Sequence, residues 1–226
     1  MAGGRRVAWR EGQFLRPQHF QQLDRSIDAQ LRGRIDYVRP YAWGLTELVI
    51  DEELATLGKF GIVRAHGVMP DGTAFSIPGE FPPPEVLDLP DDTRDAVVSL
   101  TLPAAQHGAV EYQESEHAGD DARFLVEESE IVDAFSDDRS AEPIDLARPN
   151  LRFGVTRDQT YGRVCLGLAK VRELQAKRLM FDDRYIPPTL DIAASQRLKR
   201  GLSDIIGRAE QRGNELALRA VEATDG

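Results

Sequence analysis

Short apolar runs separated by turn-forming residues fill the chain from residue 42 to residue 187, and they limit its fold more than any other feature. Runs rich in Val, Ile and Phe, with no helical periodicity between them, are typical of an antiparallel sandwich or barrel. In Pro70-Asp-Gly-Thr, Gly72 supplies the positive φ that a tight hairpin turn requires. We therefore predict a mainly β fold, an antiparallel β-sandwich, with strands at Leu45–Ile50, Phe60–Met69, Ala74–Ile77, Ala96–Leu102, Arg123–Phe135, Ile144–Val155, Arg163–Val171 and Leu174–Met180.

A helix is predicted before this β region, from Pro17 to about Tyr37. Pro17 suits the first turn of a helix, because its fixed φ and missing N–H cost little there. Apolar residues then recur at spacings of three and four, which draws one apolar stripe along the helix. The stripe consists of Phe20, Leu23, Ile27, Leu31 and Ile35.

A second, longer helix is predicted after Pro187 and Pro188, where Thr189 or Asp191 could cap it. Its apolar residues follow a nearly heptad spacing up to about Val221, which is typical of a stem that packs along other helices. The predicted parts are an N-terminal arm and helix (1–40), the sandwich (41–188) and a first stem helix (189–226). The seam of the stem is formed by Leu198, Leu202, Ile205, Ala209 and Leu216.

The charge and composition of the chain argue against several classes of partner. The formal net charge is −10 and the pI is about 5.0, whereas a nucleic-acid binder needs a basic stripe to neutralise phosphates. An anionic membrane surface is disfavoured for the same reason. Cys165 is the single cysteine, which excludes an intrachain disulfide and fits a reducing cytoplasm. No secretory signal and no apolar run of membrane-spanning length is found.

No set of residues in the sequence assembles into a catalytic or metal site. Adjacent acidic residues, such as Asp51-Glu-Glu and Asp182-Asp, point apart and are assigned to turns and surface. The polar loop Gln106–Asp121 holds acidic residues and two histidines that could ligate a cation, but a solvated, mobile loop is favoured. We predict no enzyme, no metal, no cofactor and no small-molecule substrate; the histidines are His19, His66, His107 and His117.

The unusual feature is a crowd of large apolar side chains near the N-terminus, between Trp9 and Phe20. They could fold back and fill the core of the sheet, or they could anchor another chain, since aromatic residues are enriched at interfaces. The sequence leaves both interpretations open. For Asp182-Asp-Arg-Tyr-Ile-Pro-Pro, the favoured interpretation is a rigid hinge between the sheet and the stem.

These residues also resemble a known family. Trp9-x-Glu-Gly-x-Phe-Leu-x-Pro-Gln-His-Phe is similar to the opening signature of the TssK family (also called ImpJ or VasE) of type VI secretion baseplate subunits. Three later stretches match that family in the same order. They are Ala42-Trp-Gly-Leu, Gly67-Val-Met-Pro-Asp-Gly-Thr-Ala-Phe-Ser-Ile-Pro and Phe181-Asp-Asp-Arg-Tyr-Ile-Pro-Pro-Thr-Leu.

The resemblance implies a structural adaptor of a contractile injection machine. Proteins of this family are trimers whose N-terminal β-sandwich, similar to the shoulder of phage receptor-binding proteins, joins baseplate wedge subunits of the TssF and TssG kind. A helical stem and a C-terminal head follow, and the head meets the membrane complex. Family members are longer, so this chain is expected to be the shoulder and first stem helix without the head. The implied location is the cytoplasm, at a baseplate docked on the inner-membrane complex.

The resemblance also implies which residues bind the partner. The aromatic side chains of the signature would be buried as anchors, and Glu11, Gln18 and His19 would fix their geometry by hydrogen bonds. The alternative is a module, like those of phage receptor-binding proteins, that recognises a glycan or surface ligand. The partner-binding candidates are Trp9, Glu11, Gly12, Phe14, Leu15, Pro17, Gln18, His19 and Phe20.

Overall fold

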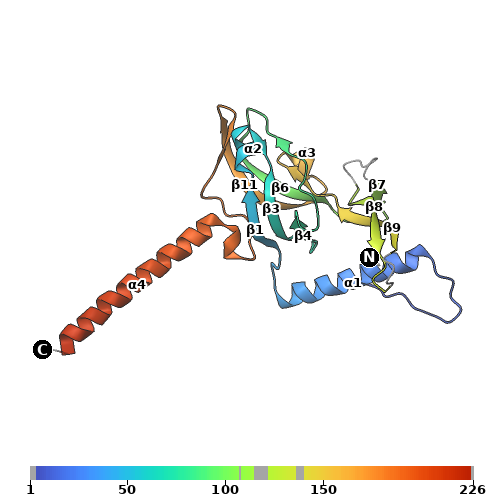
Figure 1. Cartoon of the computed structure of the whole chain (residues 1–226), viewed down its shortest axis with the longest axis horizontal. Helices are drawn as coiled ribbons and strands as arrows, with labels where there is room; N and C mark the ends of the chain where they lie inside the picture. The colour runs from blue at the N-terminus through green and yellow to red at the C-terminus, as the bar shows by residue number, and fades with distance from the viewer. Residues whose placement is uncertain (1–3, 107, 115–121, 136–139, 225–226) are drawn as a thin grey trace.

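The computed structural model describes residues 4–106, 108–114, 122–135 and 140–224. Strands form most of the body, and one long helix lies near each end of the chain (Figure 1). The helix that follows the N-terminal arm is α1 (Pro17–Val38), and the helix that projects from the body is α4 (Gln196–Thr224). The predicted fold class, mainly β with an N-terminal and a C-terminal helix, is confirmed.

Two antiparallel sheets enclose the core of the body. Phe60 lies at its centre with no exposed surface, and its ring meets those of Phe153 and Phe181 edge-on at centroid distances of 5.0 and 6.2 Å. Buried side chains from both sheets belong to the same cluster, as expected of a sandwich. The first sheet contains β1 (Gly44–Ile50), β3 (Ile62–Val68) and β4 (Ala74–Ile77); the second contains β10 (Arg152–Gly154), β6 (Arg94–Pro103), β11 (Arg163–Gln175) and β12 (Arg178–Phe181).

A two-stranded ribbon leaves the body on one side. Strands β8 (Phe124–Val132) and β9 (Ala141–Pro149) pair antiparallel along their whole length. A short strand, β7 (Tyr112–Glu114), runs parallel to the first residues of β8. Another short pair, β2 (Lys59–Phe60) with β5 (Leu87–Asp88), lies at the body.

The hairpin at Pro70–Thr73 forms as predicted. Gly72 has a φ of +89°, and the Met69 N–H donates to the Thr73 carbonyl at 2.8 Å. The Asp71 carboxylate accepts a hydrogen bond from the Thr73 N–H at 3.0 Å, which closes the turn between β3 and β4.

Three stretches that are far apart in the sequence cross where the stem leaves the body. Gly44 has a φ of +135°, and a Cβ atom there would lie 2.9 Å from the Pro188 carbonyl oxygen. Gly67 faces the Gly44 backbone so closely that it too has no room for a side chain. Leu45 donates to Pro188 at 2.9 Å and accepts from Leu190 at 2.8 Å. The two prolines therefore stiffen a junction that backbone hydrogen bonds fasten to β1.

The first turn of the stem is capped in two stages. The Asp191 carboxylate accepts from the Ala193 N–H at 2.8 Å and caps the 3-10 helix η2 (Ile192–Ala194). The Ser195 carbonyl then accepts from Lys199 at 3.0 Å, and its hydroxyl accepts from Leu198 at 3.4 Å, so α4 begins one residue later. Asp191 was a predicted cap, whereas Ser195 was not.

Several details of the prediction were wrong. The predicted strand Leu174–Met180 contains the turn between β11 and β12, because Ala176 and Lys177 adopt positive φ angles of 51° and 64°. The predicted Ile144–Val155 is two strands, β9 and β10. The β region also holds two short helices, α2 (Glu52–Thr56), which Asp51 caps, and α3 (Arg157–Thr160). The predicted loop Gln106–Asp121 includes β7.

Candidate docking surface

The N-terminal arm runs back along α1 and is fastened to it by polar contacts. Gln22 donates from its side-chain amide to the Arg5 carbonyl at 2.7 Å, and Arg6 donates to the Gln30 side chain at 2.8 Å. Gly12, with a φ of +72°, turns the chain before the helix starts at Pro17. The arm and α1 therefore form one unit, the arm–helix unit, which comprises residues 4–38.

His19 organises the end of this unit. Its Nδ1 accepts a hydrogen bond from the Arg16 N–H at 3.0 Å, and its Nε2 lies 2.6 Å from the Gln13 side-chain amide. The Trp9 ring lies 6.0 Å from the His19 ring and 6.4 Å from the ring of Phe20. His19 is one of the three residues that were predicted to fix the geometry of the aromatic side chains by hydrogen bonds.

The other two polar candidates differ from His19. The side chains of Glu11 and Gln18 are exposed and make no hydrogen bond within the described part of the chain. The contact of the Gln13 side chain with the His19 ring was not predicted. Glu11 and Gln18 are thus available to a partner rather than used by the fold.

The large apolar side chains of the signature lie outside the sandwich core. Phe14 is 80% exposed, and none of the four apolar residues belongs to the core cluster. A side chain that fills a core loses nearly all its exposed surface, so the first of the two interpretations does not describe this chain. The other three, each about half exposed, are Trp9, Leu15 and Phe20.

The apolar stripe of α1 also faces away from the body. The helix meets the body through Arg25, which pairs with Glu111 at 3.2 Å, and through Arg32, which lies against Gly72. Ser26, 1% exposed, lies instead in the row of Gln22 and Gln30 that holds the arm. At 3.6 residues per turn, most of the stripe lies on the side of the helix away from Arg25 and Arg32. Phe20, Ile27, Leu31 and Ile35 each keep about half of their surface exposed, and Val38 extends the stripe at the end of α1. Periodicity predicted this stripe but not that it lacks a cover.

The stem seam is likewise uncovered within the chain. In Figure 1, α4 leaves the body and extends away from it. Ile205 is 66% exposed and Leu202 is 43% exposed, while Leu198, next to the body, is half-buried. Ala209 and Leu216 are exposed as well, so the structure assigns no packing partner to the seam among the described residues.

A buried arginine that the sequence did not reveal fixes the root of the β8–β9 ribbon. Arg123, 6% exposed, donates to the Asp71 carboxylate at 2.6 Å, to the Thr73 hydroxyl at 2.8 Å and to the Pro103 carbonyl. Its guanidinium lies 5.4 Å above the ring of Phe124, the first residue of β8. These contacts join the ribbon to the β3–β4 hairpin and to the end of β6.

The same arginine controls the charge of Asp71. Burial alone raises the pKa of this carboxyl, but the Thr73 N–H and the Arg123 guanidinium outweigh burial and hold the pKa below its ordinary value of 3.8. Asp71 is therefore ionised at neutral pH, and the pair is a charge-assisted hydrogen bond between the buried Arg123 and the half-buried Asp71.

The histidines and acidic residues were examined in the sequence as possible metal ligands. The described residues contain no group of three or more His, Cys, Asp and Glu side chains able to hold a metal ion. His66 pairs with Glu47 at 3.4 Å on the exposed face of the first sheet. His107 and His117 lie outside the described residues. Among the described helices, none has an apolar stretch long enough to cross a membrane.

A cavity of about 610 Å³ lies beside β6 and β11, and arginines line it. Arg163 donates to the Thr101 hydroxyl at 2.9 Å, and Arg152 donates to the Asn150 side chain at 3.1 Å. Arg123, the third, is held as described above. Arg163 thus fastens β11 to β6, which is a structural use of its charge.

Uncovered aromatic and helical surfaces on a β-sandwich are typical of proteins that bind other proteins. The comparisons with known proteins agree. The family profile described as bacterial type VI secretion, with ImpJ and VasE among its names, matches residues 19–226, and the chain belongs to that family. The predicted resemblance is confirmed.

The similar proteins are TssK subunits. The type VI secretion system baseplate component TssK1 of Pseudomonas aeruginosa is 39% identical over 227 residues, which cover 100% of this chain and 51% of that protein. A crystal structure of TssK superposes with a TM-score of 0.86 at 30% identity, over 96% of this chain and 50% of the other. The chain thus spans about half the length of the curated relative it matches.

A structure titled as the type VI secretion TssK-TssF-TssG baseplate subcomplex matches with a TM-score of 0.83 at 21% identity. It covers 94% of this chain and 71% of the other. At 21% identity this structural similarity establishes only that the two chains share a fold.

Proposed function

We propose that this chain is a structural adaptor of a type VI secretion baseplate, and that its arm–helix unit docks onto wedge subunits of the TssF and TssG kind. The observation that carries the proposal is the exposure of the aromatic signature: Phe14, Trp9 and Phe20 lie on the surface although the sandwich has a complete core of its own. Burial of one such side chain at an interface stabilises binding by about 1.5–3 kcal/mol. Membership of the family and the name of the TssK1 relative support this role.

The rest of the expected organisation belongs to the same proposal. The protein acts by binding, without turnover, in the cytoplasm at a baseplate docked on the inner-membrane complex. Residues 1–40 form the docking arm and helix, 41–188 the sandwich shoulder, and 189–226 the first stem helix. The uncovered seam of α4 supports a homotrimer, since heptad-like seams pack against other helices. Contact with the membrane complex is assigned to a C-terminal head beyond these residues.

A pull-down tests the docking role. We expect a Trp9→Ala, Phe14→Ala double variant to capture wedge subunits at least about tenfold less well than the native chain, because two anchors are lost. Tyr161→Ala is the matched control, since Tyr161 is also 80% exposed but lies on the loop before β11. Equal capture by the double variant and by the control, with both proteins folded, would show that the aromatic signature is not the docking surface.

A further inference from the structure

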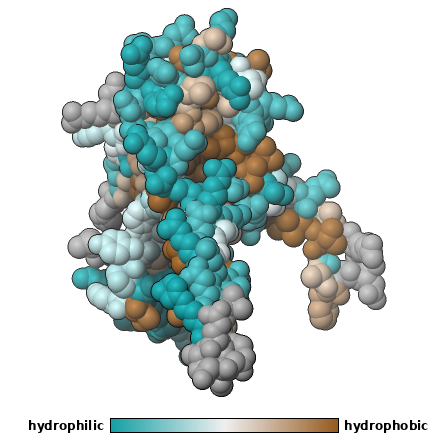
Figure 2. Space-filling model, turned by 90° about the vertical axis from the view of Figure 1, so that its left-hand side faces the viewer, coloured by the Kyte–Doolittle hydropathy of each residue, from teal (hydrophilic) through white to brown (hydrophobic). Residues whose placement is uncertain are grey.

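The arginine-lined cavity beside β6 and β11 differs in kind from the apolar surfaces of the chain. Figure 2 shows apolar atoms, in brown, on the body and on the arm that projects at its right-hand side, and such patches suit protein partners. The cavity, of about 610 Å³, is instead lined by three arginines and one carboxylate among the described residues. Small-molecule sites occupy about 300–1,000 Å³. The cavity therefore has the size and the charge to take a small anion.

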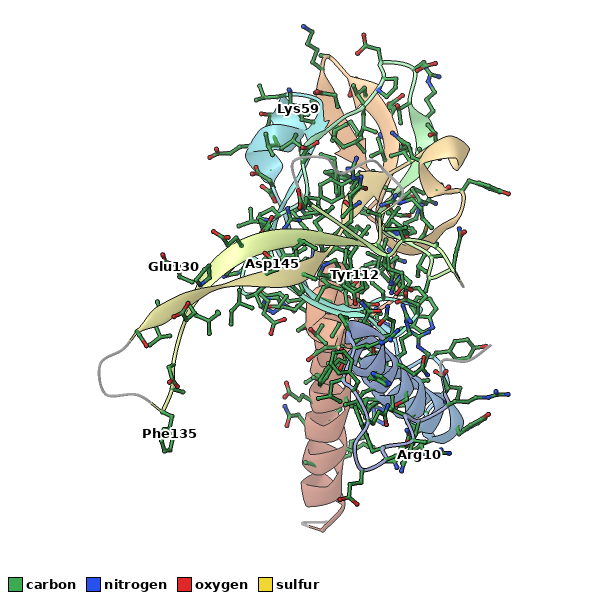
Figure 3. All side chains as sticks on the ribbon, turned by 90° about the vertical axis from the view of Figure 1, so that its right-hand side faces the viewer. Arg10, Lys59, Tyr112, Glu130, Phe135 and Asp145 are labelled. Carbon is green, nitrogen blue, oxygen red and sulfur yellow. The ribbon has the colours of Figure 1, made fainter. Side chains whose placement is uncertain are left out.

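The cavity lies where the β8–β9 ribbon leaves the body. The stretch before β7 helps to line it, and Tyr112, the first residue of β7, is labelled at the root of the ribbon in Figure 3. Arg152 on β10 pairs with Thr101 of β6, and Arg163 on β11 pairs with Pro103 of β6. Paired residues share a face of a sheet, as do residues two apart on one strand. Arg152 and Arg163 therefore project from the same face, on either side of β6.

A buried asparagine gathers the arginines around the cavity. Asn150 is 2% exposed, and its N–H donates to the Arg123 carbonyl at 2.9 Å. Its side-chain oxygen accepts from Nε of Arg152 at 3.1 Å, and its carbonyl accepts from Nη2 of Arg163 at 3.3 Å. Two guanidinium groups that bind the same residue lie close together. The hydrogen bond from Arg163 to the buried Thr101 hydroxyl, at 2.9 Å, further fixes one of them in position.

The chemistry of two neighbouring guanidinium groups favours a bound oxyanion. Like charges repel, and their repulsion is stronger beside buried groups than in bulk water, so an anion between them lowers the free energy. A carboxylate or phosphate group accepts two parallel N–H bonds from the planar fork of a guanidinium. Because a guanidinium has five N–H donors, it can hold a contact of the fold and an oxyanion at the same time.

Gln159 adds a neutral donor to the lining. Its side-chain oxygen accepts hydrogen bonds from the N–H groups of Val155 and Thr156 at 2.9 and 3.0 Å. The oxygen is thereby occupied, and the amide nitrogen is the part of this side chain that remains to donate. Gln159 is exposed and lines the cavity together with Tyr161, which is 80% exposed. The lining thus combines charged and neutral donors at a place that solvent reaches.

We propose that this cavity binds a small oxyanion with several charged groups, a polycarboxylate or a phosphate compound, through Arg152, Arg163 and the Gln159 amide. The bound anion joins β10 to β11 across β6 and stabilises the second sheet beside the ribbon root. This inference goes beyond docking on wedge subunits and does not rest on it, because no residue of the arm–helix unit lines the cavity.

Titration calorimetry with citrate and, separately, with inorganic pyrophosphate tests the site. At about 0.15 M salt, at least one of them should bind with a dissociation constant of about 1 mM or below. Arg152→Gln and Arg163→Gln should each weaken this binding at least about tenfold. Arg178→Gln is the matched control and should leave it unchanged, since Arg178 is an exposed arginine of β12 in the same sheet.

The outcomes of this titration differ clearly. Binding of citrate alone identifies a carboxylate ligand, and binding of pyrophosphate alone identifies a phosphate ligand. The proposal is overturned if neither probe binds. It is also overturned if Arg178→Gln weakens binding as much as Arg163→Gln does, because the attraction would then come from surface charge in general.

A substitution at the mouth of the cavity avoids any loss of the contact between Arg163 and Thr101. Val110 lines the cavity and is 81% exposed, so Val110→Glu places a carboxylate beside the arginines without disturbing the core. It should weaken binding of the same probe at least about tenfold, whereas the neutral Val110→Gln should change it less than about twofold. In thermal melts, the probe should raise the melting temperature of the native chain and of Val110→Gln more than that of Val110→Glu. Equal binding by the two Val110 variants would contradict the proposal.

Discussion

The sandwich interior and the arm–helix unit contain the same kinds of side chain in opposite surroundings. Phe60 has no exposed surface and meets the rings of Phe153 and Phe181 from the second sheet, whereas Phe14 is 80% exposed. The interior is closed by sheet ladders, but the arm is attached to α1 by a few side-chain hydrogen bonds. An apolar side chain stabilises the fold only where neighbours cover it, so the arm keeps its apolar surface for association.

The largest predicted loss of stability is in the interior of the sandwich. Phe60→Ala should lower the free energy of unfolding by about 4 kcal/mol, because it removes a fully buried ring and leaves a cavity between the sheets. Urea denaturation followed by circular dichroism measures the change. Phe60→Leu, which fills most of the space, should lose much less. A loss below about 1 kcal/mol for Phe60→Ala would mean that the centre of the core lies elsewhere.

A smaller loss of stability is expected at the Asp71–Arg123 pair, which joins the body to the root of the β8–β9 ribbon. Asp71→Asn leaves the Arg123 guanidinium buried without its carboxylate, which should cost about 3 kcal/mol. The pKa of Asp71 is lowered in the folded chain, so its contribution is complete above the unfolded pKa near 3.9 and is lost as the pH falls toward the lower folded value. The native chain should therefore lose more stability than Asp71→Asn between neutral pH and about pH 3.

Thermal melts of both proteins across that pH range check this expectation. Other carboxylates titrate in both chains, so the difference between the two curves isolates Asp71. Asp182→Asn is a control, since the pKa of Asp182 is also lowered, chiefly by the Arg184 N–H, but its partner Arg184 is exposed rather than buried. Parallel curves for the native chain and Asp71→Asn would show that the pair does not stabilise the ribbon root.

The sequence predicted those parts of the fold that depend on neighbouring residues. Pro17 marked the start of α1, and Asp71 and Gly72 marked the hairpin, because each acts through its own backbone geometry. The turn at Ala176 and Lys177 was missed because neither residue is a usual carrier of positive φ. The close approach of Lys177 to Gly58 shows that tertiary packing shapes this turn.

Contacts between distant residues explain what else was missed. Arg123 and Asp71 are 52 residues apart, so neither one marks the other in the sequence. For the docking surface, periodicity predicted the α1 stripe from Phe20 to Ile35 but not which side of the helix meets the body. That side carries Arg25 and Arg32, whose contacts with Glu111 and Gly72 only the folded chain reveals. The family signature marked Trp9 and Phe14 as partner-binding residues, and their binding role stays a prediction.

The smallest effect on stability is expected at the arm, and it sharpens the comparison most. Phe14→Ala should change the free energy of unfolding by less than about 0.5 kcal/mol, because the exposed ring has little surface to lose on unfolding. Urea denaturation of Phe14→Ala and Phe60→Ala would thus give different losses of unfolding free energy for the same substitution, because the two rings have different surroundings. Phe153→Ala, at a buried ring that touches Phe60, should follow the interior result. A loss at Phe14 as large as at Phe60 would mean that the arm packs as part of the fold, and its aromatic residues would then have no surface left for a partner.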